Sequence, residues 1–467
     1  MSEKRDVSGL LENVEVVKSE TAFKPLNKET EELSNNEKKS NWMRLDNAAT
    51  IYPAAKNRVW DASFRVGVVL KEEVDGELLQ KAMDDIFKKI PTYKVQLRMG
   101  LFWYYFEKMQ RTDVVEEEHY YPCSKFDVIH SDKPPIRVVY YKRRIAIEAF
   151  HSVADGGSVN EVLKMLVSRY LQLKGYDIKK SELVVDYEIP PTESETSDAF
   201  QKHYKKMKGL SRAESNAYQY RPKGLKKNYA KVIHAIMPVE DVKRLAKEKG
   251  VSITEYLSVV YLYATYININ KPINKHIKIS IPMNLRPRLN ENTFRNFSLY
   301  TNIGFNPKKR MSMTFDEILE EVRGQLKEGL SEENIYKMIS SNVGDSKNPA
   351  IRFMPMVVKF LALKVAYRVF GQYKFTAPFT NLGVAKWPED ISEHIDRLEL
   401  VLGGSPTTRM NLAAVSDGEY INLSSLGYTD ERVIEKNMFR FLAEHGVRIK
   451  IESSIDDCES EVTANAL

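Results

Sequence analysis

The chain alternates strand-like and helix-like segments in two blocks, and a polar stretch separates the blocks. The first block covers residues 41–175 and the second covers residues 227–453. Residues 176–226 are polar, interrupted by proline and rich in lysine, which is typical of a linker or crossover. A chain of 467 residues is also too long for one compact core. We therefore predict an α+β protein, an α/β sandwich of two subdomains with mixed β-sheets.

The two ends of the chain differ from these blocks in composition. Residues 1–40 mix acids, lysines, serine and asparagine with few aromatics, which predicts a disordered lead, and residues 454–467 are expected to form a flexible tail. The start of the chain lacks the basic segment and apolar core of a signal peptide. Cys123 and Cys458 lie far apart without metal-ligand spacing. Neither a disulfide framework nor a zinc site is expected, and a reducing cytoplasm is the default location.

Composition excludes some classes of function. The net charge of +6 is spread along the chain without a basic block that contains aromatics, so an anionic small ligand is favoured over nucleic acid. No stretch reaches the roughly 18 apolar residues of a transmembrane helix. The best candidate, Met354 to Phe370, is interrupted by Lys359, Lys364 and Arg368. We interpret it as a packed surface helix, with a membrane-surface helix as the alternative.

Hydrophobic periodicity predicts the main elements. Arg144 to Phe150 is apolar on both faces, which indicates a strand in the centre of its sheet. Residues 158–175 carry a helical apolar stripe that ends at a glycine. In the second block, Phe315 to about Met338 is expected to form one long amphipathic helix, and Ile395 to Leu402 one of its strands.

The segment "AFHSVADGGSV" at residues 149–159 joins the central strand to the helix that follows. We expect Gly156 and Gly157 to permit positive φ and a sharp turn, which would aim His151 out of the sheet into a cleft. Imidazole suits general-base chemistry near neutral pH. Asp155, four residues on, either caps the helix or braces the loop through an arginine.

The same residues allow other interpretations. His151 could be a buried histidine with a structural hydrogen bond beside an N-terminal helix cap. A metal site with His151 and Asp155 lacks an obvious third ligand nearby in the sequence. The serine-hydrolase motif G-x-S-x-G is absent. The glycine-rich motifs of nucleotide-binding loops are absent as well.

Four segments resemble the chloramphenicol-acetyltransferase-like superfamily, which includes condensation domains, BAHD acyltransferases and alcohol acetyltransferases. "FHSVADGG" is similar to its H-H-x-x-x-D-G signature. "WMRLDNAATIYP" (42–53) resembles the opening of the bacterial alcohol-acetyltransferase-like branch. "SIPMNLRPRL" (280–289) and "FTNLG" (379–383) resemble its N-L-R and [ST]-N-L-G segments. The segments follow the order of that branch over residues 42–452.

The chain departs from the superfamily pattern at two places. Phe150 stands where the signature often has its first histidine. The late D-F-G-W-G signature is missing, which argues against the plant BAHD branch. No carrier or adenylation region is attached, which argues against a multimodular peptide synthetase.

The resemblance implies an acyltransferase whose subdomains meet at a tunnel, with His151 midway along it. His151 would deprotonate an acceptor alcohol, which attacks the thioester of acyl-CoA, with no acyl-enzyme and no cofactor other than acyl-CoA as co-substrate. The acyl group would be acetyl and the partners acyl-CoA and a small-molecule acceptor. Alternatives are a condensation enzyme that uses an acyl or peptidyl carrier protein, and a non-catalytic relative that binds a ligand.

The resemblance also implies roles for further residues. Thr380 and Asn381 are the candidates for stabilising the oxyanion or binding the substrate, since their segment approaches the tunnel in the family. Asp155 would be structural and paired with Arg286, with Arg288 as the second choice. Gly156 and Gly157 would form the turn that presents the base, and no metal ligand is expected.

Overall fold

The computed structural model describes residues 41–56, 62–111, 113–125, 128–129, 132–207, 214–221, 230–404, 408, 410–429 and 431–454. The expected lead over residues 1–40 lies outside these ranges, as does the expected tail from residue 455 onward. Parts of the connecting stretch 176–226 also lie outside them. None of the helices formed by the described residues combines the length and the apolar character that crossing a bilayer requires.

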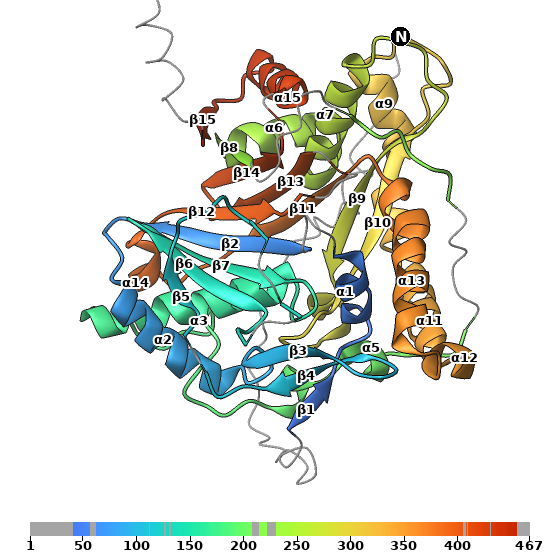
Figure 1. Ribbon diagram of the computed structural model, residues 1–467. Coiled ribbons are helices and arrows are strands. Elements are labelled where there is room, and N and C mark those ends of the chain that lie inside the picture. Colours follow the sequence, from blue (N-terminus) through green and yellow to red (C-terminus); the bar gives the residue numbers. More distant parts are fainter. Residues whose placement is uncertain are drawn as a thin grey trace, which may run out of the picture.

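The first block folds around a five-stranded mixed sheet in the order β12-β2-β7-β6-β5. Its strands are β2 (Ser63–Leu70), β5 (Val115–Glu117), β6 (Ile136–Tyr141), β7 (Arg144–Phe150) and β12 (Ile395–Leu402). Helices α2 (Gly76–Lys89) and α3 (Gly156–Lys174) pack on it. A small sheet, β1-β4-β3, is formed by β1 (Trp42–Arg44), β3 (Val95–Met99) and β4 (Tyr104–Lys108). β7 is central, as its apolar faces predicted (Figure 1).

The second block folds around a seven-stranded mixed sheet in the order β10-β9-β11-β13-β14-β8-β15. Its strands are β8 (Lys231–Pro238), β9 (Ile277–Asn284), β10 (Ser298–Phe305), β11 (Ala377–Val384), β13 (Met410–Ser416), β14 (Tyr420–Gly427) and β15 (Lys450–Ser453). Helices α6 (Val239–Glu248), α7 (Ile253–Ile267) and α15 (Val433–Glu444) lie beside one another above this sheet (Figure 1). Each large sheet has its own hydrophobic core.

Strand β12 crosses from the second block into the first sheet. It pairs antiparallel with β2, with Leu400 opposite Val66. Its buried Glu399 accepts hydrogen bonds from Arg144 of β7 at 2.7 Å and from Arg397 at 3.1 Å. The division of the sequence placed this strand in the second block because residues 395–402 lie within that part of the chain. The pairing instead connects the two blocks by a strand that completes the first sheet.

The expectation of one long helix from Phe315 to about Met338 is wrong. The segment forms three helices, α9 (Phe315–Val322), α10 (Gln325–Gly329) and α11 (Glu332–Lys347). Gly324 takes a left-handed conformation with φ 79° between the first two, which ends the helical path. Ser331 caps α11 by accepting a hydrogen bond from the Asn334 N–H group.

Two short helices, α4 (Glu193–Thr196) and α5 (Ala199–Lys202), lie in the connecting stretch. Phe200 of α5 is buried in a third apolar cluster that includes Phe297 and Ile339 of the second block. The described part of the stretch therefore packs against the protein.

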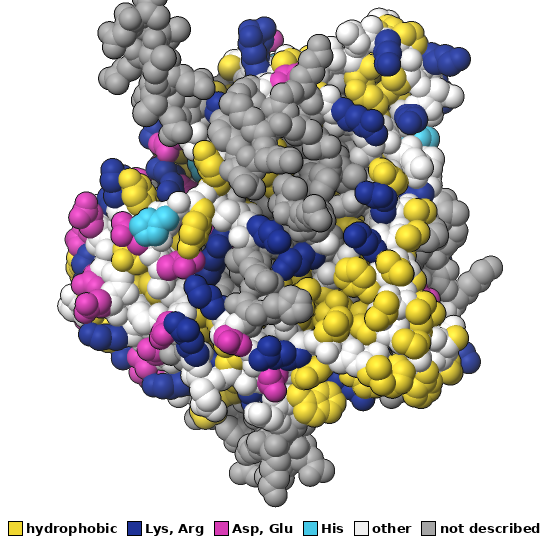
Figure 2. All heavy atoms as spheres, viewed as in Figure 1, with side chains coloured by type: hydrophobic (Ala, Val, Ile, Leu, Met, Phe, Trp, Pro, Cys, Tyr) yellow, Lys and Arg dark blue, Asp and Glu magenta, His cyan; other side chains and the backbone are white. Residues whose placement is uncertain are grey.

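Helix α13 (Met356–Ala366) and the π-helical turn η3 (Tyr367–Gly371) form the segment for which a packed surface helix was expected. Helix α12 (Pro349–Arg352) precedes them. One face of α13 packs on the protein, but its other face is apolar and exposed. Figure 2 shows hydrophobic side chains gathered over this region, at the position of α11 to α13 in Figure 1.

Candidate active site

His151 directly follows the central strand of the first sheet. Its backbone N–H donates to the carbonyl of Ala62 at 3.0 Å, which continues the pairing of β7 with β2. The preceding Phe150 is fully buried in the first core, whereas His151 is half-buried and lines a large cavity. A polar residue at position 150 would be buried in this core.

Asn296 sets the tautomer of His151. The Asn296 side-chain nitrogen donates to the Asp46 carboxylate at 3.1 Å and faces the Ser152 carbonyl at 3.5 Å. Its side-chain oxygen therefore lies towards His151 Nδ1, at 3.3 Å. An amide oxygen only accepts hydrogen bonds, so this contact favours the His151 tautomer that carries its proton on Nδ1. Nε2 is left with a lone pair that can take a proton.

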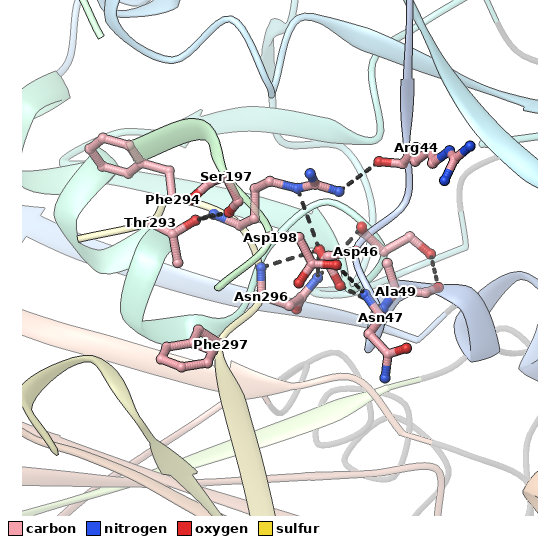
Figure 3. A network of polar contacts seen from close by, with 12 residues as sticks. Arg44, Asp46, Asn47, Ala49, Ser197, Asp198, Thr293, Phe294, Asn296 and Phe297 are labelled. Carbon is pink, nitrogen blue, oxygen red and sulfur yellow. Dashed lines mark hydrogen bonds and ion pairs between the residues drawn. The ribbon is translucent and has the colours of Figure 1, made fainter. Parts of the chain in front are cut away.

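A buried polar network holds Asn296 in this orientation (Figure 3). Asp46 accepts from the Asn296 backbone at 3.3 Å and from the Ala49 N–H at 2.8 Å. Arg295 lies 3.9 Å from the Asp46 carboxylate and donates to the Arg44 carbonyl at 2.6 Å. Burial raises the pKa of Asp46 to about 7, although Arg295 opposes the shift.

Aromatic rings fix the plane of the imidazole. Tyr52, in helix α1 (Tyr52–Ala55), stacks on His151 with ring centroids 4.5 Å apart and planes 12° from parallel. Phe64 of β2 packs against it at 4.9 Å. Burial lowers the pKa of His151 below its ordinary value because it disfavours the imidazolium form, while Asp155 and Asn296 oppose this shift. The uncharged form of the imidazole is therefore favoured.

Asp155 and Arg286 form a buried ion pair between the two blocks, at 3.0 Å. Asp155 caps α3 by accepting from the Ser158 N–H at 3.0 Å, and it also accepts from the Phe297 N–H at 2.7 Å. Burial alone would raise the pKa of Asp155, but Arg286 and these N–H groups hold it below its ordinary value. Asp155 thus combines the two roles that the sequence left open, helix cap and loop brace.

The remaining donors of Arg286 are also satisfied. Its guanidinium donates to the Thr293 carbonyl at 2.7 Å, to the Asn284 side-chain oxygen at 3.0 Å and to the Arg295 carbonyl. Arg288, the second choice from the sequence, donates instead to the Leu330 carbonyl on an exposed part of the protein. The partner of Asp155 is therefore Arg286.

The expected positive φ at Gly156 and Gly157 is wrong, since both residues are in the first turn of α3 and neither has a positive φ. Both glycines instead lie in close contact with the second block. A Cβ on Gly157 would lie 3.2 Å from the Asn284 side-chain nitrogen, and one on Gly156 would lie 3.3 Å from Leu382 of β11. The glycines allow the second block to approach the start of α3.

The structure separates the two polar residues of β11. Asn381 donates to the Thr254 hydroxyl at 3.0 Å and accepts from the Gly383 N–H at 2.8 Å, so it is held towards α7. Thr380 lies on the other side of the strand from Asn381, because side chains alternate along a strand. Leu382 packs on the first core beside Gly156. Both Thr380 and Asn381 line the cavity.

The cavity lies between the two blocks and has a volume of about 3470 Å³. Residues from both blocks line it, including His151 and Thr380. Typical pockets for one small ligand have about 300–1,000 Å³, so this cavity has room for two substrates. Exposed cations line the part formed by α6, α9 and α10: Lys243, Lys247, Arg323 and Lys327.

Within the described residues, no group of three or more His, Cys, Asp or Glu side chains is placed to hold a metal ion. His151 and Asp155 do not converge on a common point as ligands would, since one bonds to Asn296 and the other to Arg286.

Sequence reasoning missed Asn296, Asp46 and Tyr52. Asp46 and Tyr52 lie in the quoted segment 42–53, which was recognised without a role for either residue. Asn296 follows the N-L-R segment by about ten residues and carries no motif of its own. Only the fold brings it to His151, 145 residues away in the chain.

We predict that Asp155→Ala lowers stability strongly, because it leaves Arg286 buried without its counter-charge. Removal of one partner from a buried pair typically costs about 3–5 kcal/mol. Denaturant unfolding measures the loss. Asp316→Ala is the matched control, since Asp316 pairs with Lys249 on the surface and the change should cost no more than about 1 kcal/mol. A loss at Asp155 as small as at Asp316 would contradict the structural role.

Comparisons with known proteins bear on the fold. No family model matches the sequence, and no curated protein is significantly similar to it. TRI101 of Fusarium graminearum, solved with coenzyme A and T-2 mycotoxin, is 9% identical, and the match covers 88% of this chain and 100% of TRI101 with a TM-score of 0.57. TRI3 trichothecene 15-O-acetyltransferase of Fusarium sporotrichioides is 11% identical, with coverage of 91% and 99% and a TM-score of 0.56.

A third similar structure is polyketide synthase associated protein 5 of Mycobacterium tuberculosis, at 12% identity, coverage of 85% and 96%, and a TM-score of 0.55. These likenesses extend over most of each chain. They agree with the α+β organisation and with the two mixed sheets described above. The chain has the fold of the chloramphenicol-acetyltransferase-like superfamily, as the sequence resemblance predicted.

Proposed function

We propose that the protein is an acyltransferase that moves an acyl group from an acyl-CoA thioester to an alcohol, with His151 as general base. The observation that carries this proposal is the orientation of the imidazole. Its Nδ1 is bound to Asn296 and its ring lines a cavity between the two blocks. A histidine with only a structural role would not need a fixed tautomer beside a cavity large enough for two substrates.

The reaction uses one proton and no acyl-enzyme. Nε2 of His151 takes the proton of the acceptor hydroxyl as its oxygen attacks the thioester carbonyl. The resulting tetrahedral oxyanion collapses and expels the thiolate of coenzyme A. The imidazolium then returns the proton to the thiolate, so the ester and free coenzyme A leave a regenerated base. The uncharged state of His151, favoured by burial, is the state that this cycle requires.

Thr380 is the better of the two candidates for stabilising the oxyanion. Its side chain leaves β11 on the face opposite Asn381, which is held towards α7. Asn381 already uses its side chain to bind Thr254 and Gly383. A fixed hydroxyl donor at the reacting carbonyl would stabilise the charge that develops there.

The cations of α6, α9 and α10 suit the donor. Lys243, Lys247, Arg323 and Lys327 are exposed at one part of the cavity. Coenzyme A carries phosphates, which such a group of cations would attract. TRI101, which has this fold, was solved with coenzyme A. A carrier protein with a phosphopantetheine arm offers similar charges, and it is the second candidate donor.

We predict that His151→Ala loses activity by about 10²–10⁴-fold, which is the usual contribution of a general base. Transfer from a panel of acyl-CoA donors to mixed alcohols, followed by mass spectrometry, measures it. Circular dichroism and thermal unfolding establish that the variant is folded. His119→Ala is the matched control, because His119 is exposed, and it should keep wild-type activity.

A folded His151→Ala variant with wild-type transfer would contradict the assigned role. If wild type transfers nothing from free acyl-CoA but does so from a loaded carrier protein, the carrier-dependent function replaces the first proposal. If ligands bind tightly and neither donor supports turnover, the protein is a non-catalytic relative.

The pH dependence should follow the lowered pKa of His151. Because the reaction needs the unprotonated base, kcat/KM should rise with pH through a midpoint below 6.5 and then stay level. Asp46, with a pKa of about 7, is the second group that titrates in this range. A midpoint near 7 would assign the titration to Asp46 and would contradict the assignment to His151.

Thr380→Val should lower kcat by about 10–10³-fold with little change in KM, since an oxyanion donor acts in the transition state. Thr380→Ser keeps the hydroxyl and should retain most of the activity. Steady-state kinetics of the two variants separate loss of the donor from loss of packing. Equal losses in both variants would assign Thr380 a packing role instead.

A further inference from the structure

The outward side of helix α13 is an apolar surface. Five aliphatic side chains, between 42% and 73% exposed, form a stripe at helical spacing along α13 and η3: Val357, Val358, Leu361, Val365 and Val369. Phe353, just before α13, is 64% exposed. Large apolar patches on a protein surface mark sites of interaction. Figure 2 shows this patch as the main gathering of hydrophobic side chains in that view.

The turn between β3 and β4 extends the same surface. Leu101 and Trp103 are exposed in this turn, at 73% and 38%. The Met356 N–H donates to the Leu101 carbonyl at 2.8 Å, and Lys359 donates to the Phe102 carbonyl at 2.6 Å. The turn is therefore fixed to the start of α13. Two segments about 250 residues apart thus present apolar side chains side by side.

The segment of the chain that carries the stripe is basic. Residues 346–388 contain seven lysines and arginines and no aspartate or glutamate. Lys364 and Arg368 are exposed next to the apolar stripe. A helix with an exposed apolar face, flanking basic residues and a nearby tryptophan has the features of a segment that lies in a membrane interface.

The inward side of α13 lines the cavity. Met356, Leu363 and Tyr367 are among its lining residues, and α13 packs against α1, which carries Tyr52 beside His151. One helix therefore has the reaction cavity on one side and the apolar stripe on the other. A lipid surface in contact with the stripe would lie next to the cavity.

We propose that the apolar face of α13 and η3, together with the β3–β4 turn, docks the protein on the surface of an anionic lipid membrane. The aliphatic side chains enter the interface, and Lys364 and Arg368 beside the stripe contact the anionic headgroups. This proposal concerns binding alone, so it holds or fails independently of the acyl transfer proposed above.

Co-sedimentation of the full chain with lipid vesicles tests the proposal. The protein should bind phosphatidylcholine vesicles that contain phosphatidylglycerol and bind pure phosphatidylcholine vesicles more weakly. Added salt should weaken binding to the anionic vesicles, because it screens the headgroup charge. Leu361→Asp, which puts a carboxylate in the centre of the stripe, should weaken binding by about tenfold or more.

Ile451→Asp is the matched control. Ile451 is 53% exposed and lies in β15, far from α13 in Figure 1, and the change adds the same charge. Ile451→Asp should bind vesicles like wild type. His151→Ala should also bind them like wild type, since a loss of acyl transfer in that variant concerns the catalytic proposal alone. Unfolding temperatures of all variants establish that they are folded.

Two results would overturn the proposal. One is that wild type binds neither kind of vesicle, or that folded Leu361→Asp binds as tightly as wild type. The other is that wild type is a dimer without affinity for vesicles while Leu361→Asp is a monomer, which analytical ultracentrifugation detects. The face would then be an interface between two copies of the chain.

Discussion

The buried ion pair between Asp155 and Arg286 joins the two blocks at the segment that carries His151. Asp155 caps α3 and fixes the loop that follows β7, while Arg286 fixes the segment after β9 through the carbonyls of Thr293 and Arg295. Two charges that are buried away from water stabilise each other, and removal of either one leaves the other with an uncompensated desolvation cost. The relative position of His151 and Asn296 depends on this pair, because one residue lies in each of the two segments.

The candidate site therefore belongs to neither block alone. The first block supplies His151 and the aromatic rings around it, and the second supplies Asn296, whose side-chain oxygen faces His151 Nδ1. Gly156 and Gly157 let the second block pack closely against the start of α3, since a Cβ at either position would lie close to Leu382 or Asn284. Strand β12 strengthens the same junction from the other side by completing the first sheet. The contact between His151 and Asn296 therefore exists only when the two blocks are packed together.

The local sequence was sufficient to predict part of the fold and part of the candidate site. The apolar faces of residues 144–150 indicated a central strand, and the His151 segment could be recognised because its residues are contiguous. The partner of Asp155 could be narrowed to Arg286 or Arg288 only through the family resemblance. The positive φ predicted for Gly156 and Gly157 was wrong. The local sequence does not indicate that a distant segment packs closely against them.

Other features depend on contacts between distant segments, which hydrophobic periodicity does not indicate. Nothing in residues 395–402 indicates which sheet they join. The helix break at Gly324 was missed because the apolar spacing continues across it. Asn296 has an ordinary sequence neighbourhood, and its role follows only from its position in the fold. The exposed stripe of α13 was predicted as a helix, but its exposed side depends on which face the protein covers.

The central claim is that His151 presents an unprotonated Nε2 to the cavity. Nitrogen-15 NMR of the histidine side chains at pH 7.5 tests it directly, with the His151 signals identified by their loss in His151→Gln. The account predicts a neutral ring with the proton on Nδ1, and loss of these shifts in Asn296→Leu while the other histidines are unchanged. A proton on Nε2, or a charged ring at that pH, would contradict it.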